Sequence, residues 1–154
     1  MKERIAILMG YMEVQRATIT RISDKLKSLD PLDEHEMIHS AYLLHNLYNA
    51  YEDLFQEISV CFENNIERSS GYHKNILMRM KISIPGIRPS ILSDESFNLL
   101  SELLGFRHVF RHAYNYNLEP GKLQELRKKV NEGRENIERD ISLFDHYLSE
   151  LLQN

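Results

Sequence analysis

The sequence has few of the features that cross-link, anchor or export small proteins. It contains one cysteine, Cys61, so no disulfide can form within the chain, and we expect this thiol to be a small buried apolar group. The longest run without Asp, Glu, Lys or Arg covers residues 37–51 and still carries two histidines and two asparagines, so we expect no membrane span. Residues 1–4, Met-Lys-Glu-Arg, lead into an amphipathic stretch, so we expect no signal peptide and a reduced, cytoplasmic setting.

The sequence also lacks a large charge excess. Its 19 basic and 23 acidic residues leave a net charge of −4, which argues against a protein that coats nucleic acid through overall charge. Residues 68–93 are a local exception, because they contain no acid and five bases, namely Arg68, Lys74, Arg79, Lys81 and Arg88. This segment could attract a polyanion or be a solvated basic loop, and the sequence favours neither.

Helical periodicity is abundant. Apolar residues recur at helical spacing over residues 3–29 and, without a slip, from Met37 to Phe62. Asp33 followed by Glu36 has the form of a capping box for the second helix, and Ser69-Ser70-Gly71 predicts its end. Further helices are predicted over 72–81, from about Ser93, and over about 120–152. Two prolines and a glycine in residues 84–89 predict an irregular loop. The expected fold is all-α, with four long helices and a short one in an antiparallel bundle, over a single domain of residues 1–154.

Residues that could carry chemistry gather in residues 105–114, at the end of the third long helix. This stretch contains Arg107, His108, Arg111, His112 and Tyr114. A fixed cation and a group that exchanges protons near neutral pH suit metal-free cleavage of a phosphodiester. Because a helix turns about 100° per residue, Arg107 and Tyr114 share a face, whereas Arg107 and His112 lie about 140° apart. A site shared between two copies of the chain, or unwinding near His112, would bring them together.

Other interpretations of these residues are open. The arginines could be surface groups, with His112 half-buried and Tyr114 in the core with a wet hydroxyl. His108 and His112 also match a pair of metal ligands four residues apart, but no His-Glu-x-x-His pattern or cysteine pair accompanies them. We therefore expect no metal and no cofactor. The second predicted helix contains His35, His39 and His45. These histidines do not share one face, and the sequence assigns them no role.

The order Arg-x4-His-x-Tyr, late in an all-helical chain, resembles the signature of HEPN-domain ribonucleases and, among these, of HepT toxins. The wider run Phe-Arg-His-x-x-Arg-His-x-Tyr, from Phe106 to Tyr114, resembles one branch of HepT-like proteins. The segment from Arg88 to Asp94, Arg-Pro-Ser-Ile-Leu-Ser-Asp, resembles the same branch. In many family members asparagine follows the arginine, whereas this chain has His108, which leaves open a share for His108 in proton transfer.

The resemblance implies a symmetric homodimer whose two motifs face a cleft that admits RNA. In that case His112 exchanges protons with the attacking 2′-hydroxyl or the leaving oxygen. Arg107 stabilises charge on the phosphate, and His108 and Arg111 contact the substrate. Tyr114 is the position to which a minimal-nucleotidyltransferase antitoxin transfers AMP, a bulky anion that would fill the cleft.

The resemblance thus implies the toxin of a toxin–antitoxin module, acting as a metal-independent endoribonuclease. One alternative is a catalytically silent HEPN-like bundle that docks a nucleotidyltransferase partner. A second is a purely structural helical adaptor.

Overall fold

A computed structural model describes residues 1–64, 72–112 and 119–154, and these residues form five helices. They are α1 (Lys2–Ser28), α2 (Glu34–Glu63), α3 (Tyr72–Lys81), α4 (Asp94–His112) and α5 (Pro120–Gln153). Within the described ranges the only extended pairing is an isolated bridge between Ile84 and Arg88. The all-α prediction is confirmed, and the short helix over 72–81 has the predicted bounds.

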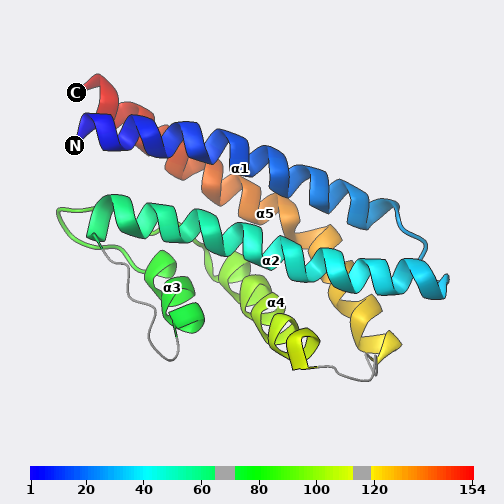
Figure 1. Ribbon diagram of the computed structural model, residues 1–154. Coiled ribbons are helices and arrows are strands. Elements are labelled where there is room, and N and C mark those ends of the chain that lie inside the picture. The colour runs from blue at the N-terminus through cyan, green and yellow to red at the C-terminus, as the bar shows by residue number, and fades with distance from the viewer. Residues whose placement is uncertain (65–71, 113–118) are drawn as a thin grey trace.

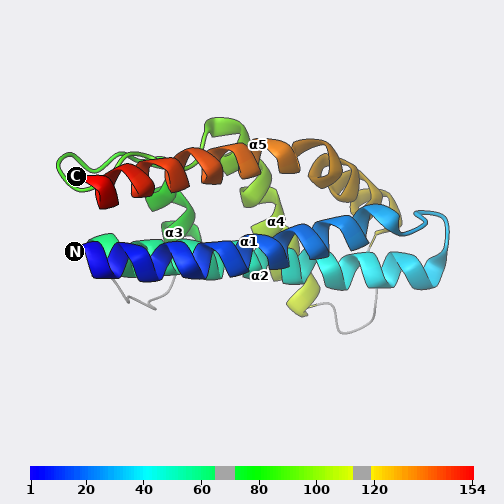
Figure 2. The same ribbon diagram turned by 90° about the horizontal axis from the view of Figure 1, so that it is seen from above.

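The long helices pack lengthwise, and the two termini lie at the same end of the bundle (Figures 1 and 2). Helix α1 runs antiparallel to both α2 and α5 and packs against these two. Helix α4 packs on α2, α3 and α5, on the other side of α2 from α1. Helix α2 therefore lies between the α1 layer and the α3–α4 layer, and its two sides bury different residues.

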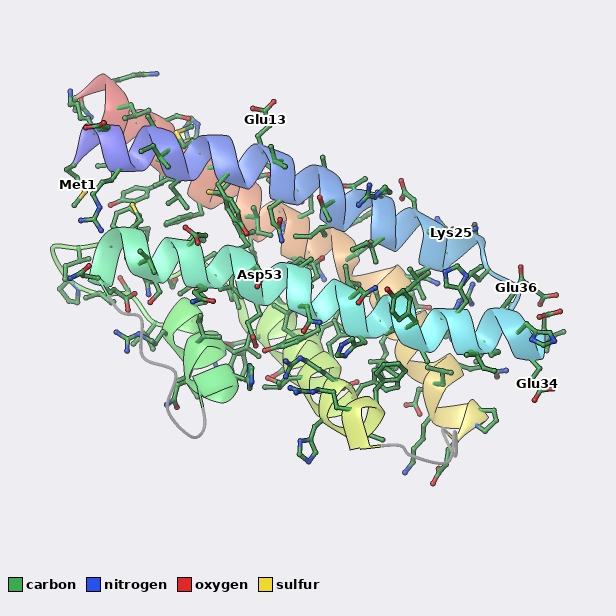
Figure 3. The ribbon with its side chains drawn as sticks, in the orientation of Figure 1. Met1, Glu13, Lys25, Glu34, Glu36 and Asp53 are labelled. Carbon is green, nitrogen blue, oxygen red and sulfur yellow. The ribbon has the colours of Figure 1, made fainter. Side chains whose placement is uncertain are left out.

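The apolar stripe predicted for α2 forms the centre of the core. Its members from Met37 to Ile58 are buried, and Phe62 is partly buried. Apolar side chains of α1, α4 and α5 cover it, among them Met12, Leu100 and Ile141. Cys61 is buried, as predicted. Charged side chains such as Glu13 and Lys25 point outward from α1 (Figure 3). None of the described helices combines the length and apolarity that a membrane crossing requires.

Helix α2 begins where the sequence predicts but ends earlier. The side chain of Asp33 accepts a hydrogen bond from the backbone N–H of Glu36 at 2.9 Å, which confirms the cap. The predicted end at residues 69–71 is wrong, because α2 ends at Glu63 and Asn64 takes the left-handed conformation with φ 50°. Asparagine is one of the few residues besides glycine that adopts this conformation readily, so it terminates a helix well. Residues 69–71 themselves lie outside the described ranges.

The irregular segment between α3 and α4 is held by one buried arginine. The Arg88 side chain is fully buried and donates to the Glu63 carboxylate, with 2.9 Å between Nε and Oε1. It also donates to the backbone carbonyls of Arg79, Ile82 and Pro89 at 3.0–3.2 Å. At the far end of the segment, the Ser93 N–H and hydroxyl donate to the Asp140 carboxylate of α5, so α4 starts from a fixed point. The run from Arg88 to Ser93 is thus a structural clamp that fixes the start of α4.

Candidate functional site

The C-terminal half of α4 carries most of the predicted site residues. The helix continues without a break through His112, so Arg107 and His112 are about 140° apart around it and roughly 7.5 Å apart along its axis. Of the two arrangements that would bring these residues together, unwinding of the helix does not occur before His112. The side chain of His112 and all of Tyr114 lie outside the part of the chain that the structure describes, so their roles stay predictions.

Arg107 is half-buried and points toward α2 and α3, where polar side chains hold it. Its Nε donates to Oδ1 of Asn49 at 2.7 Å. Its Nη1 lies 3.4 Å from Nε2 of His73, on the first turn of α3. Nδ1 of His73 in turn lies 2.7 and 2.8 Å from the two carboxylate oxygens of Glu52. Three helices therefore meet around one guanidinium.

The partners of Arg107 on α2 were missed by the sequence analysis, although a signal for them exists. His45 does not share a face with His35 or His39, but it does share one with Asn49 and Glu52, at spacings of four and three. This polar stripe follows the core stripe at an offset of one residue, and its contacts with His73 and Arg107 lie on the side of α3 and α4. Glu52 is only 7% exposed, and a carboxylate is seldom buried to this extent unless it is paired, as Glu52 is with His73.

His45 ends this network on the side of Phe110. Its Nε2 lies 3.2 Å from Nδ2 of Asn49, and its ring centroid lies 5.0 Å from that of Phe110. Burial, followed by the charges of Arg107 and Arg111, lowers the pKa of His45 below its usual value of 6.5. His45 is therefore neutral near pH 7. Its buried Nδ1 has no hydrogen-bond partner among the described residues.

The other predicted substrate contacts are on the surface of α4. His108 and Arg111 are both exposed. Arg111 lies one turn beyond Arg107, and both of their charges act on His45, so the two arginines place positive charge on the α2 side of the helix. Within residues 1–64, 72–112 and 119–154 no group of three or more His, Cys, Asp or Glu side chains is arranged to hold a metal ion.

The basic segment of residues 68–93 does not form a free cationic surface where its side chains are described. Arg79 and Arg88 both bind Glu63, and Lys81 pairs with Asp94 at 3.2 Å. Burial alone would raise the pKa of Glu63, but the hydrogen bonds from Arg88 and Arg79 outweigh it and the pKa is lowered. These three cations stabilise the fold. Arg68 lies outside the described ranges, and so does the side chain of Lys74.

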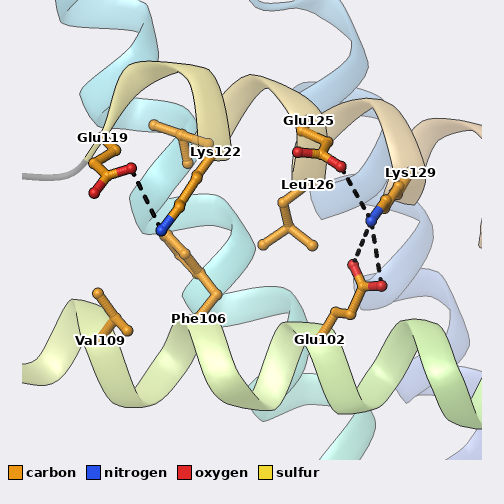
Figure 4. Close-up of a pocket in the computed structure, with 9 residues that line it drawn as sticks. Glu102, Phe106, Val109, Glu119, Lys122, Glu125, Leu126 and Lys129 are labelled. Carbon is orange, nitrogen blue, oxygen red and sulfur yellow. Dashed lines mark hydrogen bonds and ion pairs between the residues drawn. The ribbon is translucent and has the colours of Figure 1, made fainter.

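A groove of about 450 Å³ lies on the opposite side of α4, against the start of α5 (Figure 4). Phe106, Val109 and Leu126 make its floor apolar. Its two lysines are each paired with acids: Lys122 with Glu119 at 3.4 Å, and Lys129 with Glu102 and Glu125 at 3.1 and 3.3 Å. With its cations neutralised and its acids in excess, this groove does not suit a polyanion. The face with Arg107 is the better candidate site.

A second apolar groove lies between the start of α2 and Phe110. Ile38 and Tyr42 line it and are 50% and 54% exposed, and Val109 on the neighbouring groove is 55% exposed. The end of α4 is therefore flanked by uncovered apolar side chains on two sides.

The fold and the site define an all-helical bundle with an arginine-centred polar site at the end of its fourth helix. Residues 39–148 match the sequence model of the family described as HepT-like protein, and this match covers most of the chain. The chain belongs to the HepT-like family. The matched range includes the arginine network, the clamp at Arg88 and the stretch from Arg107 to Tyr114. Comparison with curated proteins and with solved structures gives no match.

Proposed function

We propose that the chain is the toxin of a toxin–antitoxin module and cleaves RNA without a metal ion through Arg107 and His112. Members of its family are typically HEPN ribonucleases, and this chain keeps the Arg-x4-His-x-Tyr order. The observation that carries the proposal is the set of contacts that Arg107 makes. Arg16, Arg79 and Arg88 form ion pairs with carboxylates, whereas the contacts of Arg107 with the described residues are to the Asn49 amide oxygen and to Nε2 of His73. Its charge is anchored but not neutralised.

An anchored and unneutralised guanidinium suits a phosphate that gains charge during a reaction. A planar guanidinium offers parallel N–H donors to two phosphate oxygens, and donors that are already oriented need little reorganisation. Arg111, one turn further along α4, adds a second positive charge on the same side of the helix. We assign Arg107 to the phosphate, and Arg111 and His108 to contacts with the RNA strand.

Cleavage through the 2′-hydroxyl requires two proton transfers. The 2′-oxygen attacks phosphorus while a base takes its proton, and the leaving 5′-oxygen receives a proton, so the products carry a 2′,3′-cyclic phosphate and a 5′-hydroxyl. An imidazole with an ordinary pKa near 6.5 can serve as base or as acid at neutral pH. We assign His112 to one of these transfers. His108, one helical turn before it, is the candidate for the other, in addition to its contact with the strand.

A symmetric homodimer would complete this site. Because α4 is continuous, the backbone positions of Arg107 and His112 lie about 140° apart around its axis, so we assign part of the contacts around one phosphate to a second copy of the chain. The exposed apolar side chains beside the end of α4, Ile38, Tyr42 and Val109, would be covered by such an interface.

Regulation is proposed to act through Tyr114. Transfer of AMP to its hydroxyl by a minimal-nucleotidyltransferase antitoxin would place a bulky anion beside the motif, where it would compete with RNA for Arg107 and Arg111. This assignment rests on the family and on the position of Tyr114 two residues after His112.

The test is incubation of the purified chain with total RNA in EDTA, with analysis of the product ends. We expect cleavage that survives chelation, leaves 2′,3′-cyclic phosphate ends and disappears in His112→Ala. His146→Ala, which removes an exposed histidine of α5, is the matched control and should cleave like the wild type. Full activity of His112→Ala would contradict the catalytic assignment. If the wild type cuts no RNA, the intact mass of the preparation distinguishes two causes. Added AMP indicates a neutralised toxin, whereas its absence would favour the catalytically silent binding module.

A further inference from the structure

We propose that Asn49 and His73 are positioning residues that hold the Arg107 guanidinium from two sides, and that Glu52 fixes the proton on His73 that this arrangement needs. The catalytic consequence rests on the proposed function, whereas the positioning itself rests on the contacts alone. None of these three residues belongs to the Arg-x4-His-x-Tyr stretch. They come from α2 and α3, so the inference extends the site to two further helices.

The placement of protons follows from the fact that an arginine side chain only donates hydrogen bonds. Nε of Arg107 donates to Asn49, so the atom of Asn49 at 2.7 Å is its carbonyl oxygen. Nη1 of Arg107 faces Nε2 of His73, so Nε2 must carry the lone pair. In a neutral imidazole the proton then sits on Nδ1, which donates to the Glu52 carboxylate at 2.7–2.8 Å. Glu52 thereby selects the tautomer of His73 that can receive Arg107.

The contact with His45 also fixes the orientation of the Asn49 amide. With its oxygen turned to Arg107, the amide presents its NH2 group to Nε2 of His45 at 3.2 Å. His45 accepts this bond as a neutral ring. A rotated amide would lose both contacts, so His45 and Arg107 together hold Asn49 in one orientation.

Two contacts at different corners restrict both the position and the rotation of a planar group. Asn49 holds Nε and His73 holds one hydrogen of Nη1, which leaves the second hydrogen of Nη1 and both of Nη2 without a contact to the described residues. Those hydrogens lie on the edge that forms bidentate contacts with a phosphate. A free arginine loses considerable rotamer freedom when it binds a ligand, and prior anchoring reduces that cost.

The distances rank the two contacts. The bond to Asn49 at 2.7 Å is short, whereas the contact to His73 at 3.4 Å is long, so removal of Asn49 should have the larger effect. Removal of the whole His73 ring would also leave the buried Glu52 carboxylate without its partner and could unfold the chain. His73→Asn is therefore the better variant, since its amide N–H can still reach Glu52 while the Nε2 acceptor is lost.

The first experiment measures the positioning without any reaction. In 15N NMR spectra of arginine side chains, the Nε–H of Arg107 is identified by its loss in Arg107→Lys. We expect its exchange with water to be about tenfold slower than that of the exposed Arg139, and to approach the Arg139 rate in Asn49→Ala. His73→Asn should raise the mobility of the guanidinium to a smaller extent. Glu57→Gln, on the exposed side of α2, and His146→Ala are controls and should change nothing.

The second experiment measures RNA cleavage in a double-mutant cycle. We expect Asn49→Ala to lower kcat/KM about 100-fold and His73→Asn about tenfold, because small displacements of a catalytic group have effects of this size. If both act through Arg107, neither change should reduce the residual activity of Arg107→Lys any further. Circular dichroism of each variant shows whether the fold is kept.

The two experiments separate the inference from the proposed function. If Asn49→Ala and His73→Asn leave the exchange and mobility of Arg107 unchanged, the positioning inference is overturned, whether or not RNA is cut. If they change both while the unmodified wild type cuts no RNA, the positioning stands and the ribonuclease proposal fails. Losses of activity that persist at full size in the Arg107→Lys background would mean that these residues act on the substrate directly, which also overturns the inference.

Discussion

Replacement of Arg88 by alanine should be among the most destabilising single changes in this chain. The Arg88 side chain is fully buried, and the Glu63 side chain that it binds is only 4% exposed. Loss of one partner from a buried ion pair costs about 3–5 kcal/mol, because the other charge remains in a poor solvent. Three backbone carbonyls also lose their donor, at about 1 kcal/mol each where water does not replace it.

One contact reduces this loss. Arg79 still donates to Glu63 at 2.6 Å, and with 38% of its side chain exposed it can follow the carboxylate toward water. We therefore expect Arg88→Ala to lower the free energy of unfolding by about 4 kcal/mol, a large part of the roughly 5–15 kcal/mol typical of a domain.

The assay is urea unfolding followed by far-ultraviolet circular dichroism. Arg139→Ala is the matched control, since Arg139 is exposed and contacts only the nearby Asn136 among the described residues, and it should cost less than about 0.5 kcal/mol. Replacement of both Arg88 and Glu63 by methionine should lose clearly less than the sum of the two single replacements, because no unpaired charge is left behind. A loss below about 1 kcal/mol for Arg88→Ala would refute the reasoning.

Three further predictions concern stability. Burial and the charges of Arg107 and Arg111 lower the pKa of His45, so the unfolded chain binds the proton more readily than the folded chain. The free energy of unfolding should fall as the pH drops below about 6.5, and urea titrations of His45→Gln should show a smaller fall. Asp140→Ala removes the acceptor for both donors of Ser93 at the start of α4 and should cost about 1–2 kcal/mol in the same assay, with much of the loss recovered in Asp140→Asn. Gly10→Ala should raise the melting temperature by about 2–4 °C, since Gly10 is exposed within α1 and an added methyl group meets no other atom within 4 Å.

The helices and their starts were predictable because their signals are local. A repeat of three and four residues shows which side of a helix is apolar, and Asp33 with Glu36 marks a start through a contact three residues long. The end of α2 was predicted too late because Ser69-Ser70-Gly71 is a stronger helix-breaking pattern in the sequence than Asn64. A single asparagine in the left-handed conformation nevertheless ends the helix.

Arg107 was predicted from the stretch around it, but its surroundings were not. Asn49, Glu52 and His73 lie between 34 and 58 residues before Arg107 in the chain, and no local pattern links them to it. In the same way, the basic residues of 68–93 read as a possible polyanion surface until Glu63, from another helix, is seen to neutralise two of them.

The sequence by itself determined the all-α class, the order of the helices along the chain and the stretch that carries Arg107, His112 and Tyr114, since these depend on residues close together in the chain. Only the tertiary structure decided which charges are neutralised and which are merely anchored. Arg88 and Arg107 both donate hydrogen bonds to other helices, but packing places Arg88 against a buried carboxylate and Arg107 against an amide and an imidazole. That difference follows from the way α2 packs against α3 and α4, and it separates a structural clamp from a candidate catalytic group.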